Sequence, residues 1–303
     1  MPRYSSSIDG ANLFYRQYHP TSSPTPYRLE TSAEAKTRTL VLLHQWPLSS
    51  RMYDPILVQL SESHRYPCIA PDRRGFGNSD WVNAVAKGGV SYDVLAQDIV
   101  DLLETTKPGP FVFVAASMGT GEALLAYSKS AYIREHCQGM IWISTSLPYP
   151  VQSPDFPDAL PRGAWDATLD AIRKDRSSFI EAIIRGPIGV GASRTVSDKT
   201  VKQFERIFFQ SDPIAVERCL QVFTSVDLTE KIREFGEAFR HPFLLIHGSA
   251  DGGVSAASSV DLVKKVVPKA ELRLYEEGGH ILILAYTDEL LSDIVQFMNA
   301  LDG

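Results

Sequence analysis

Three side chains that can pass a proton along a line occur far apart in the sequence: the hydroxyl of Ser117, the carboxylate of Asp251 and the imidazole of His280. A serine hydroxyl becomes a strong nucleophile when an imidazole removes its proton, and a carboxylate holds that imidazole in the required tautomer. The chain order Ser, Asp, His is one in which such triads occur. We therefore predict that Ser117 attacks an acyl carbon, with His280 as base and Asp251 as the supporting acid.

The segment around Ser117 predicts a sharp turn from a strand into a helix. The apolar run FVFVAA at 111–116 leads directly into Ser117, and the small residues Ala115, Gly119 and Gly121 surround it. This A-x-S-x-G pattern differs from the G-x-S-x-G of a nucleophile elbow only in its first position. The motif alone leaves open that Ser117 is an ordinary helix cap. Whether Ser117 is a nucleophile therefore depends on Asp251 and His280.

Asp251 and His280 each follow a predicted strand. Asp251 lies in HGSADGGVS after the run FLLIH, and His280 follows two glycines after LRLY at 272–275. Active groups of open parallel sheets gather at the carboxyl ends of the strands. Singly, Asp251 could be a turn former and His280 a surface residue, but jointly with Ser117 they favour a triad.

Two further segments follow strands at the same predicted edge. After TLVLL, the residues HQWP would supply the backbone N–H of Trp46 to a developing oxyanion, opposite the N–H of Met118 at the start of the next helix. The segment APDRRGFGNSD at 70–80 could bind phosphate or metal. We favour a hydrogen-bonded network of Asp72, Arg73 and Arg74 that braces the loops under the site.

Short apolar runs alternate with helical patterns, which is typical of a mostly parallel sheet with helices on both faces. The strands are expected at Asn12–Tyr18, Thr39–Leu43, 66–70, 111–115, 140–144, 243–247 and 272–275. The helices are expected at 52–63, Tyr92–Thr106, 119–130, 256–267 and 289–301.

Two stretches interrupt this alternation. Residues 20–37 are polar and rich in Pro, Ser and Thr, which predicts a long exposed loop. Residues 147–240 offer no strong strand but several amphipathic helices rich in aromatic residues. We expect these aromatic residues to form an apolar wall over the site, with ordinary cap core as the alternative for any single one: Trp165, Phe179, Phe204, Phe208, Phe209 and Phe223. We therefore predict a core of residues 1–146 and 241–303, with an all-helical cap at 147–240 inserted before the last two strands.

Composition excludes several classes of protein. The 303 residues are 44% hydrophobic and 22% charged, an ordinary globular composition. A net charge of −6 disfavours nucleic acid as a partner. We find no secretory signal at the N-terminus and no apolar stretch long enough to span a membrane. The three scattered cysteines fit neither a disulfide framework nor a metal site, and we expect a cytoplasmic protein.

Taken together, HQWPLSS, PDRRGFGNSD, SMGTGE, HGSADGGV and GGH resemble, in order and spacing, the sequence blocks of the α/β-hydrolase superfamily. The resemblance is strongest to its cofactor-free haloperoxidase, perhydrolase and aryl-esterase group. It implies the α/β-hydrolase fold and a carboxylic ester hydrolase of class EC 3.1.1. Ser117, Asp251 and His280 would be catalytic, Trp46 and Met118 the oxyanion donors, and no cofactor or metal would be needed.

Differences from the family pattern point to a reshaped pocket. Gln45 stands where the family has glycine, and Ala116 stands where it has phenylalanine. Pro47 matches the perhydrolytic members, which make peracids from hydrogen peroxide. We expect Gln45, Pro47 and Trp165 to contact a small-molecule acyl substrate, and the chain to be a monomer or homodimer.

Other functions remain open at this point. Gln45 keeps open a non-hydrolytic reaction, namely carbon–carbon cleavage or cyclisation with His280 as proton shuttle. A ligand receptor that retains the triad without turnover is a further possibility. An aspartate nucleophile is absent from the elbow, which excludes dehalogenase and epoxide hydrolase chemistry.

Overall fold

The computed structural model describes residues 2–21, 36–81, 89–192 and 194–302. An eight-stranded sheet forms the centre of the molecule, in the order β1-β2-β4-β3-β5-β6-β7-β8. β1 and β2 pair antiparallel with each other, β2 is antiparallel to β4, and the remaining neighbours are parallel. The strands are β1 (Arg3–Ser5), β2 (Asn12–Tyr18), β3 (Thr39–Leu43), β4 (Cys68–Pro71), β5 (Phe111–Ala116), β6 (Cys137–Ile143), β7 (Phe243–Gly248) and β8 (Glu271–Tyr275).

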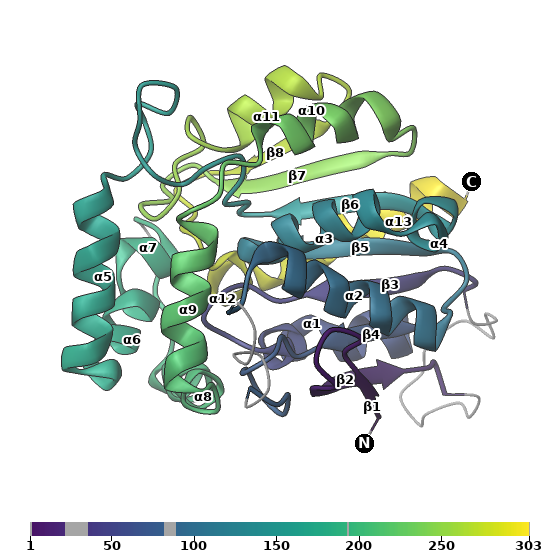
Figure 1. Ribbon diagram of the computed structural model, residues 1–303, viewed down its shortest axis with the longest axis horizontal. Helices are drawn as coiled ribbons and strands as arrows, with labels where there is room; N and C mark the ends of the chain where they lie inside the picture. Colours follow the sequence, from purple (N-terminus) through teal and green to yellow (C-terminus); the bar gives the residue numbers. More distant parts are fainter. Residues whose placement is uncertain (1, 22–35, 82–88, 193, 303) are drawn as a thin grey trace.

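Helices cover both faces of the sheet, with α2 and α3 in front and α13 behind in Figure 1. The central strands β3 and β5 are buried along their whole length, as their unbroken apolar sequences predict. The helices that pack around the sheet are α1 (Asp54–Val58), α2 (Tyr92–Thr106), α3 (Met118–Lys129), α4 (Ala131–His136), α10 (Thr229–Ala238), α11 (Val260–Val266), α12 (Leu282–Ala285) and α13 (Thr287–Asp302). The prediction of a mostly parallel α/β sheet is confirmed.

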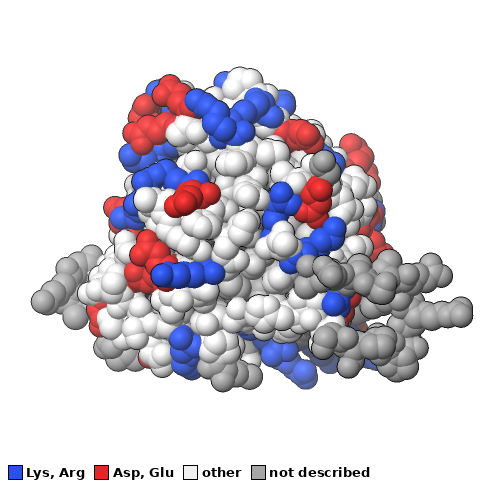
Figure 2. Space-filling view, turned by 90° about the vertical axis from the view of Figure 1, so that its right-hand side faces the viewer, with Lys and Arg blue, Asp and Glu red and all other residues white. Residues whose placement is uncertain are grey.

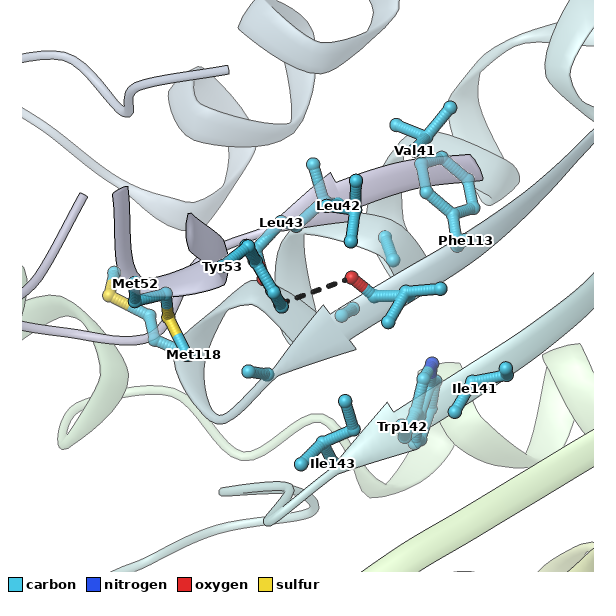
Figure 3. Close-up of a cluster of buried hydrophobic side chains, with 14 of the residues drawn as sticks. Val41, Leu42, Leu43, Met52, Tyr53, Phe113, Met118, Ile141, Trp142 and Ile143 are labelled. Atoms are coloured by element: carbon cyan, nitrogen blue, oxygen red, sulfur yellow. Dashed lines mark hydrogen bonds between the residues drawn. The ribbon is translucent and has the colours of Figure 1, made fainter. Parts of the chain in front are cut away.

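Side chains of β3, β5 and β6 interlock in the core near the carboxyl ends of these strands (Figure 3). Tyr53 lies among them, and its hydroxyl is 2.9 Å from the Leu43 carbonyl and 3.3 Å from the Val114 carbonyl. Those carbonyls belong to neighbouring strands that end at the same edge of the sheet. The core therefore fixes the edge from which the candidate site residues project.

Between β6 and β7 the chain forms helices beyond one end of the sheet, at the left of Figure 1. These are α5 (Arg162–Lys174), α6 (Arg176–Arg185), α7 (Pro187–Val190), α8 (Asp198–Phe209) and α9 (Pro213–Phe223). The following helix, α10, packs instead on the core: Phe235 stacks on Trp142 of β6 and meets Phe243 of β7 edge to face. The division into core and cap at residue 240 stays a prediction. It assigns α10 to the cap, although this helix packs on the core strands β6 and β7.

Several element boundaries differ from the sequence-based expectation. β1 was not predicted, because three residues are too short for a recognisable alternation. The helix expected at 52–63 is divided into a 3-10 turn (Ser50–Tyr53), α1 and a π-helical turn (Gln59–Ser63), with Pro55 at the start of α1. The loop expected at 20–37 lies almost wholly outside the described residues. All three cysteines are free and buried.

Candidate active site

Ser117 lies in a strained turn between β5 and α3. Its backbone has φ 51° and ψ −118°, which residues with a Cβ rarely adopt. The turn is held on both sides, because the Ser117 N–H donates to the Ile143 carbonyl at 2.8 Å and the Thr120 hydroxyl donates to the Ser117 carbonyl at 2.6 Å. α3 approaches β3 so closely that a Cβ on Gly119 would lie 2.9 Å from the Leu43 carbonyl oxygen. These contacts hold the serine hydroxyl at the carboxyl end of β5.

Asp251 and His280 meet Ser117 at this edge. Nε2 of His280 is 2.9 Å from Oγ of Ser117, and Nδ1 of His280 is 2.6 Å from Oδ2 of Asp251. An ionised carboxylate only accepts hydrogen bonds, so Nδ1 carries the proton and Nε2 is free to accept from the serine hydroxyl. The structure thus brings the three predicted residues into one hydrogen-bonded line.

The carboxylate of Asp251 is fixed by the turn after β7. Its Oδ1 accepts the backbone N–H groups of Gly253 and Val254, each at 2.9 Å. Burial alone would raise the pKa of Asp251, but its interactions with His280 and His247 and the hydrogen bond from the Val254 N–H hold this pKa below its ordinary value. Asp251 is therefore ionised and oriented toward His280.

His247 is a neighbour of Asp251 to which the sequence assigned no role. Its Nε2 donates to the Val254 carbonyl at 2.8 Å and lies 3.3 Å from Oδ2 of Asp251. Burial lowers the pKa of His247, so the ring is neutral and packs as part of the turn. The sequence contains one indication that His247 lies near Asp251: it ends a buried strand four residues before Asp251.

The backbone N–H groups of Trp46, which lines the pocket with Ser117, and of Met118, which follows Ser117 in the chain, have no acceptor within the described part of the chain. Met118 is the first residue of α3, so its N–H belongs to the unpaired, electropositive end of the helix. The preceding N–H of the Trp46 loop, that of Gln45, is instead directed at Sδ of Met52 at 3.4 Å. Both predicted oxyanion donors are open to an oxygen atom.

A buried ion pair supports the loop that carries Trp46. Arg73 pairs with Glu122 of α3, and both side chains are at most 4% exposed. The Arg73 guanidinium donates to the His44 carbonyl at 2.7 Å, and the Arg73 backbone N–H donates to Nε2 of His44 at 2.9 Å. Burial and the Arg73 charge hold the pKa of His44 well below its usual value, so the ring stays neutral. The pair connects the Trp46 loop to the helix that begins at Met118.

The neighbouring residues Asp72 and Arg74 complete this bracing network. Asp72 accepts the backbone N–H groups of Ser50 and Asn78, each at 2.9 Å. Arg74 forms ion pairs with Asp98 at 2.6 Å and with Asp9 at 2.9 Å. The hydrogen bonds predicted for Asp72, Arg73 and Arg74 are confirmed. All three charged groups have partners within the protein, which favours bracing over binding of phosphate or metal.

An apolar pocket of about 90 Å³ opens beside Ser117. Core loops and the helices that follow β6 both contribute to its wall. The lining residues are Gln45, Trp46, Pro47, Leu48, Ser117, Leu160, Trp165, Thr168, Phe179, Ile180, Ile183, Ile188, Phe223, Gly253, Val254, His280 and Ile281. This size corresponds to about six to nine water-sized groups, enough for a small organic molecule.

The pocket contains all three residues expected to contact the substrate: Gln45, Pro47 and Trp165. Two of the aromatic residues expected over the site, Phe179 and Phe223, also line it. Three others do not: Phe204 and Phe208 are buried in α8, and Phe209 is 45% exposed. The sequence missed the isoleucines of α6 and α7, because apolar helix positions give no sign of whether they face a cavity or a core.

The described residues contain no group of three His, Cys, Asp or Glu side chains placed to hold a metal ion. Within the same ranges, no helix combines the length and apolar character that crossing a membrane requires. On the face opposite α5 and α8, cations and anions are interspersed rather than gathered by sign (Figure 2).

Comparison with known proteins agrees with this architecture. Residues 38–285 match the family model described as the alpha/beta hydrolase fold. The chain is 26% identical over 300 residues to a non-heme chloroperoxidase of Kitasatospora aureofaciens, covering 96% of this chain and 97% of that protein. It is 26% identical over 301 residues to a bifunctional esterase/perhydrolase of Acinetobacter calcoaceticus, covering 98% and 99%. An esterase of Exiguobacterium antarcticum superimposes with a TM-score of 0.83 at 18% identity, covering 99% and 100%.

The chain therefore belongs to the α/β hydrolase fold family. The predicted resemblance to the haloperoxidase, perhydrolase and esterase group is confirmed by these relatives. So is the prediction of an enzyme of the hydrolase class.

Proposed function

We propose that this protein is a serine hydrolase that cleaves carboxylic esters or related acyl bonds through an acyl-enzyme. The observation that carries the proposal is the line of two hydrogen bonds, 2.9 Å from Ser117 to His280 and 2.6 Å from His280 to Asp251. It supplies a nucleophile, a base and an orienting carboxylate in mutual reach.

The reaction follows from these positions. His280 Nε2 takes the hydroxyl proton while Ser117 Oγ bonds to the acyl carbon, and the carbonyl oxygen becomes an oxyanion bound by the Trp46 and Met118 N–H groups. The imidazolium then protonates the leaving alcohol as the ester bond breaks. Water, deprotonated by His280, attacks the acyl-enzyme and releases the acid and free serine.

The pocket supports a small substrate. Its wall is mainly aliphatic and aromatic, and about 90 Å³ accommodates a short acyl group with a small alcohol. Helices α5 and α6 supply Trp165, Thr168 and Phe179 to that wall, in keeping with a cap over residues 147–240. The cytoplasmic location and the monomeric or homodimeric state stay predictions from the sequence.

A serine-reactive fluorophosphonate and a short p-nitrophenyl ester test the proposal. We expect the wild type to be labelled at Ser117 and to hydrolyse p-nitrophenyl acetate, and Ser117→Ala to lose both properties while keeping its thermal unfolding midpoint. Labelling of the wild type without turnover of any acyl ester would overturn the hydrolase proposal. That outcome would favour the lyase, cyclase or receptor alternatives.

Perhydrolysis is a second candidate reaction at the same site. In it hydrogen peroxide replaces water, so that the acyl-enzyme yields a peracid and free serine. Pro47 lines the pocket beside Ser117, and a relative over 98% of this chain is named an esterase/perhydrolase. Peracid formation from acetate and peroxide, lost in Ser117→Ala, would support this candidate; a rate equal to background would exclude it.

A further inference from the structure

Gln45 carries a side-chain amide that the protein itself does not use. Its backbone is fully engaged: the N–H faces Met52 Sδ at 3.4 Å, and the carbonyl accepts from the Leu48 N–H at 3.1 Å and from Nδ1 of His44 at 2.9 Å. The residue is only 3% exposed, and its amide has no hydrogen-bond partner within the described ranges, but neither amide atom is among those sealed from solvent. Since Gln45 lines the pocket, the amide is left for whatever occupies the pocket.

The other polar side chains of the pocket wall already have partners. The indole N–H of Trp46 donates to a backbone carbonyl at 2.9 Å, and that of Trp165 does so at 3.0 Å. The hydroxyl of Thr168 also donates to a backbone carbonyl, at 3.0 Å. The serine and imidazole of the proposed triad engage each other. Polar recognition in this otherwise apolar pocket therefore falls to Gln45.

Water in the pocket can reach this amide, but a substrate that displaces the water and offers no hydrogen bond would leave the amide unsatisfied, at a cost of about 1–3 kcal/mol for each group. An amide offers a donor and an acceptor, so it suits a hydroxyl, which can do both, or a keto oxygen, which accepts from the NH₂. Gln45 directly precedes Trp46, whose N–H is the proposed oxyanion donor. A group within its reach is therefore attached close to the scissile carbonyl.

We infer that the substrates are short esters of 2-hydroxy or 2-oxo carboxylic acids, and that the Gln45 amide binds the oxygen on carbon 2. This inference rests on the proposed function and names its substrate class. The pocket volume of about 90 Å³ fits an ester of this kind with a short alcohol. Gln45 thereby determines specificity, whereas Ser117, His280 and Asp251 perform the chemistry.

Three ethyl esters of matched size test the inference. Ethyl lactate and ethyl pyruvate carry an oxygen on carbon 2, and ethyl 2-methylpropanoate carries a methyl group in its place. The measured quantity is the selectivity, the kcat/KM for each oxygenated ester divided by the kcat/KM for ethyl 2-methylpropanoate. Comparing the selectivity of the wild type with that of Gln45→Met cancels the higher intrinsic reactivity of the 2-oxo ester.

We expect the selectivity to fall about 10–100-fold in Gln45→Met, because the variant keeps the length of the side chain but loses its hydrogen bonds. Gln45→Leu is the second variant, and thermal unfolding checks that each one folds. A selectivity within threefold of the wild type would overturn the inference. So would an equal loss on all three esters, which would make Gln45 a general oxyanion donor.

A measurement on the wild type alone keeps the inference testable if neither variant folds. Lactamide is expected to inhibit at least tenfold more tightly than 2-methylpropanamide, and equal inhibition would overturn the inference. Failure of the underlying function has a different signature. If the wild type hydrolyses none of the three esters, the hydrolase proposal fails. If it hydrolyses ethyl 2-methylpropanoate as well as the two oxygenated esters, only the inference on Gln45 fails.

Discussion

Replacing Asp251 with asparagine tests the proposed relay most directly. In the protein, Oδ1 of Asp251 accepts two backbone N–H groups at 2.9 Å each, and Oδ2 accepts from His280 at 2.6 Å. Asparagine has a single acceptor oxygen to divide between these positions. Two backbone donors outweigh one imidazole, since each lost bond to a buried N–H costs about 1–3 kcal/mol. The amide oxygen of Asn will therefore stay with the turn, and its NH₂ will face His280.

That orientation forces the wrong tautomer on His280. Its Nδ1 must accept from the amide NH₂, so the proton moves to Nε2, which faces Ser117 and can no longer take the hydroxyl proton. We expect kcat for p-nitrophenyl acetate to fall about 10⁴-fold, equivalent to about 5.5 kcal/mol of transition-state stabilisation. The assay is steady-state hydrolysis at neutral pH, with labelling by fluorophosphonate as a second readout.

Two control measurements distinguish a loss of activity caused by the wrong His280 tautomer from one caused by loss of folding. Asp251→Asn should keep the turn and unfold near the wild-type temperature, whereas Asp251→Ala loses the turn hydrogen bonds as well and should be less stable. Activity of Asp251→Asn within tenfold of the wild type would refute the reasoning, because the imidazole would then not depend on this carboxylate.

Three further predictions concern stability and the support of the site. The pKa of Asp251 lies below its ordinary value of 3.8, so its ionisation stabilises the folded state above about pH 4, and this stabilisation is lost as pH falls through the folded pKa. The Tm difference between the wild type and the less stable Asp251→Ala should therefore be smaller at pH 3 than at pH 6. Glu122→Leu leaves the buried Arg73 charge unpaired and should cost about 3–5 kcal/mol in urea unfolding, while Arg73→Met/Glu122→Leu should recover much of that loss. Gly119→Ala brings a Cβ to 2.9 Å from a β3 carbonyl and should cost about 1–3 kcal/mol and lower kcat, whereas Gly163→Ala, which meets no atom within 4 Å, should do neither.

Each of these has a contrary result. A Tm difference that is constant with pH would mean that Asp251 is not preferentially ionised in the folded state. If the double variant is as unstable as Glu122→Leu, the loss comes from packing rather than from an unpaired charge. Equal behaviour of the two glycine variants would show that α3 and β3 can separate without cost.

The sequence by itself determined the sheet and the residues of the candidate triad. The apolar runs at 40–43 and 111–116 indicate buried strands that are covered on both faces. The small residues around Ser117 indicate a tight turn from a strand into a helix. These are local constraints, visible in neighbouring residues. Position at strand ends then predicted that Ser117, Asp251 and His280 would meet.

Only the tertiary structure decided what surrounds those residues. The pairing of Arg73 with Glu122, the contact of His247 with Asp251 and the place of α10 on the core all join segments distant in sequence. An amphipathic helix has an apolar face whether it covers a sheet or a cavity, so its pattern cannot name its partner. For the same physical reason the sequence could single out Gln45, but only the folded protein shows that it lines the pocket and that its amide has no partner among the described residues.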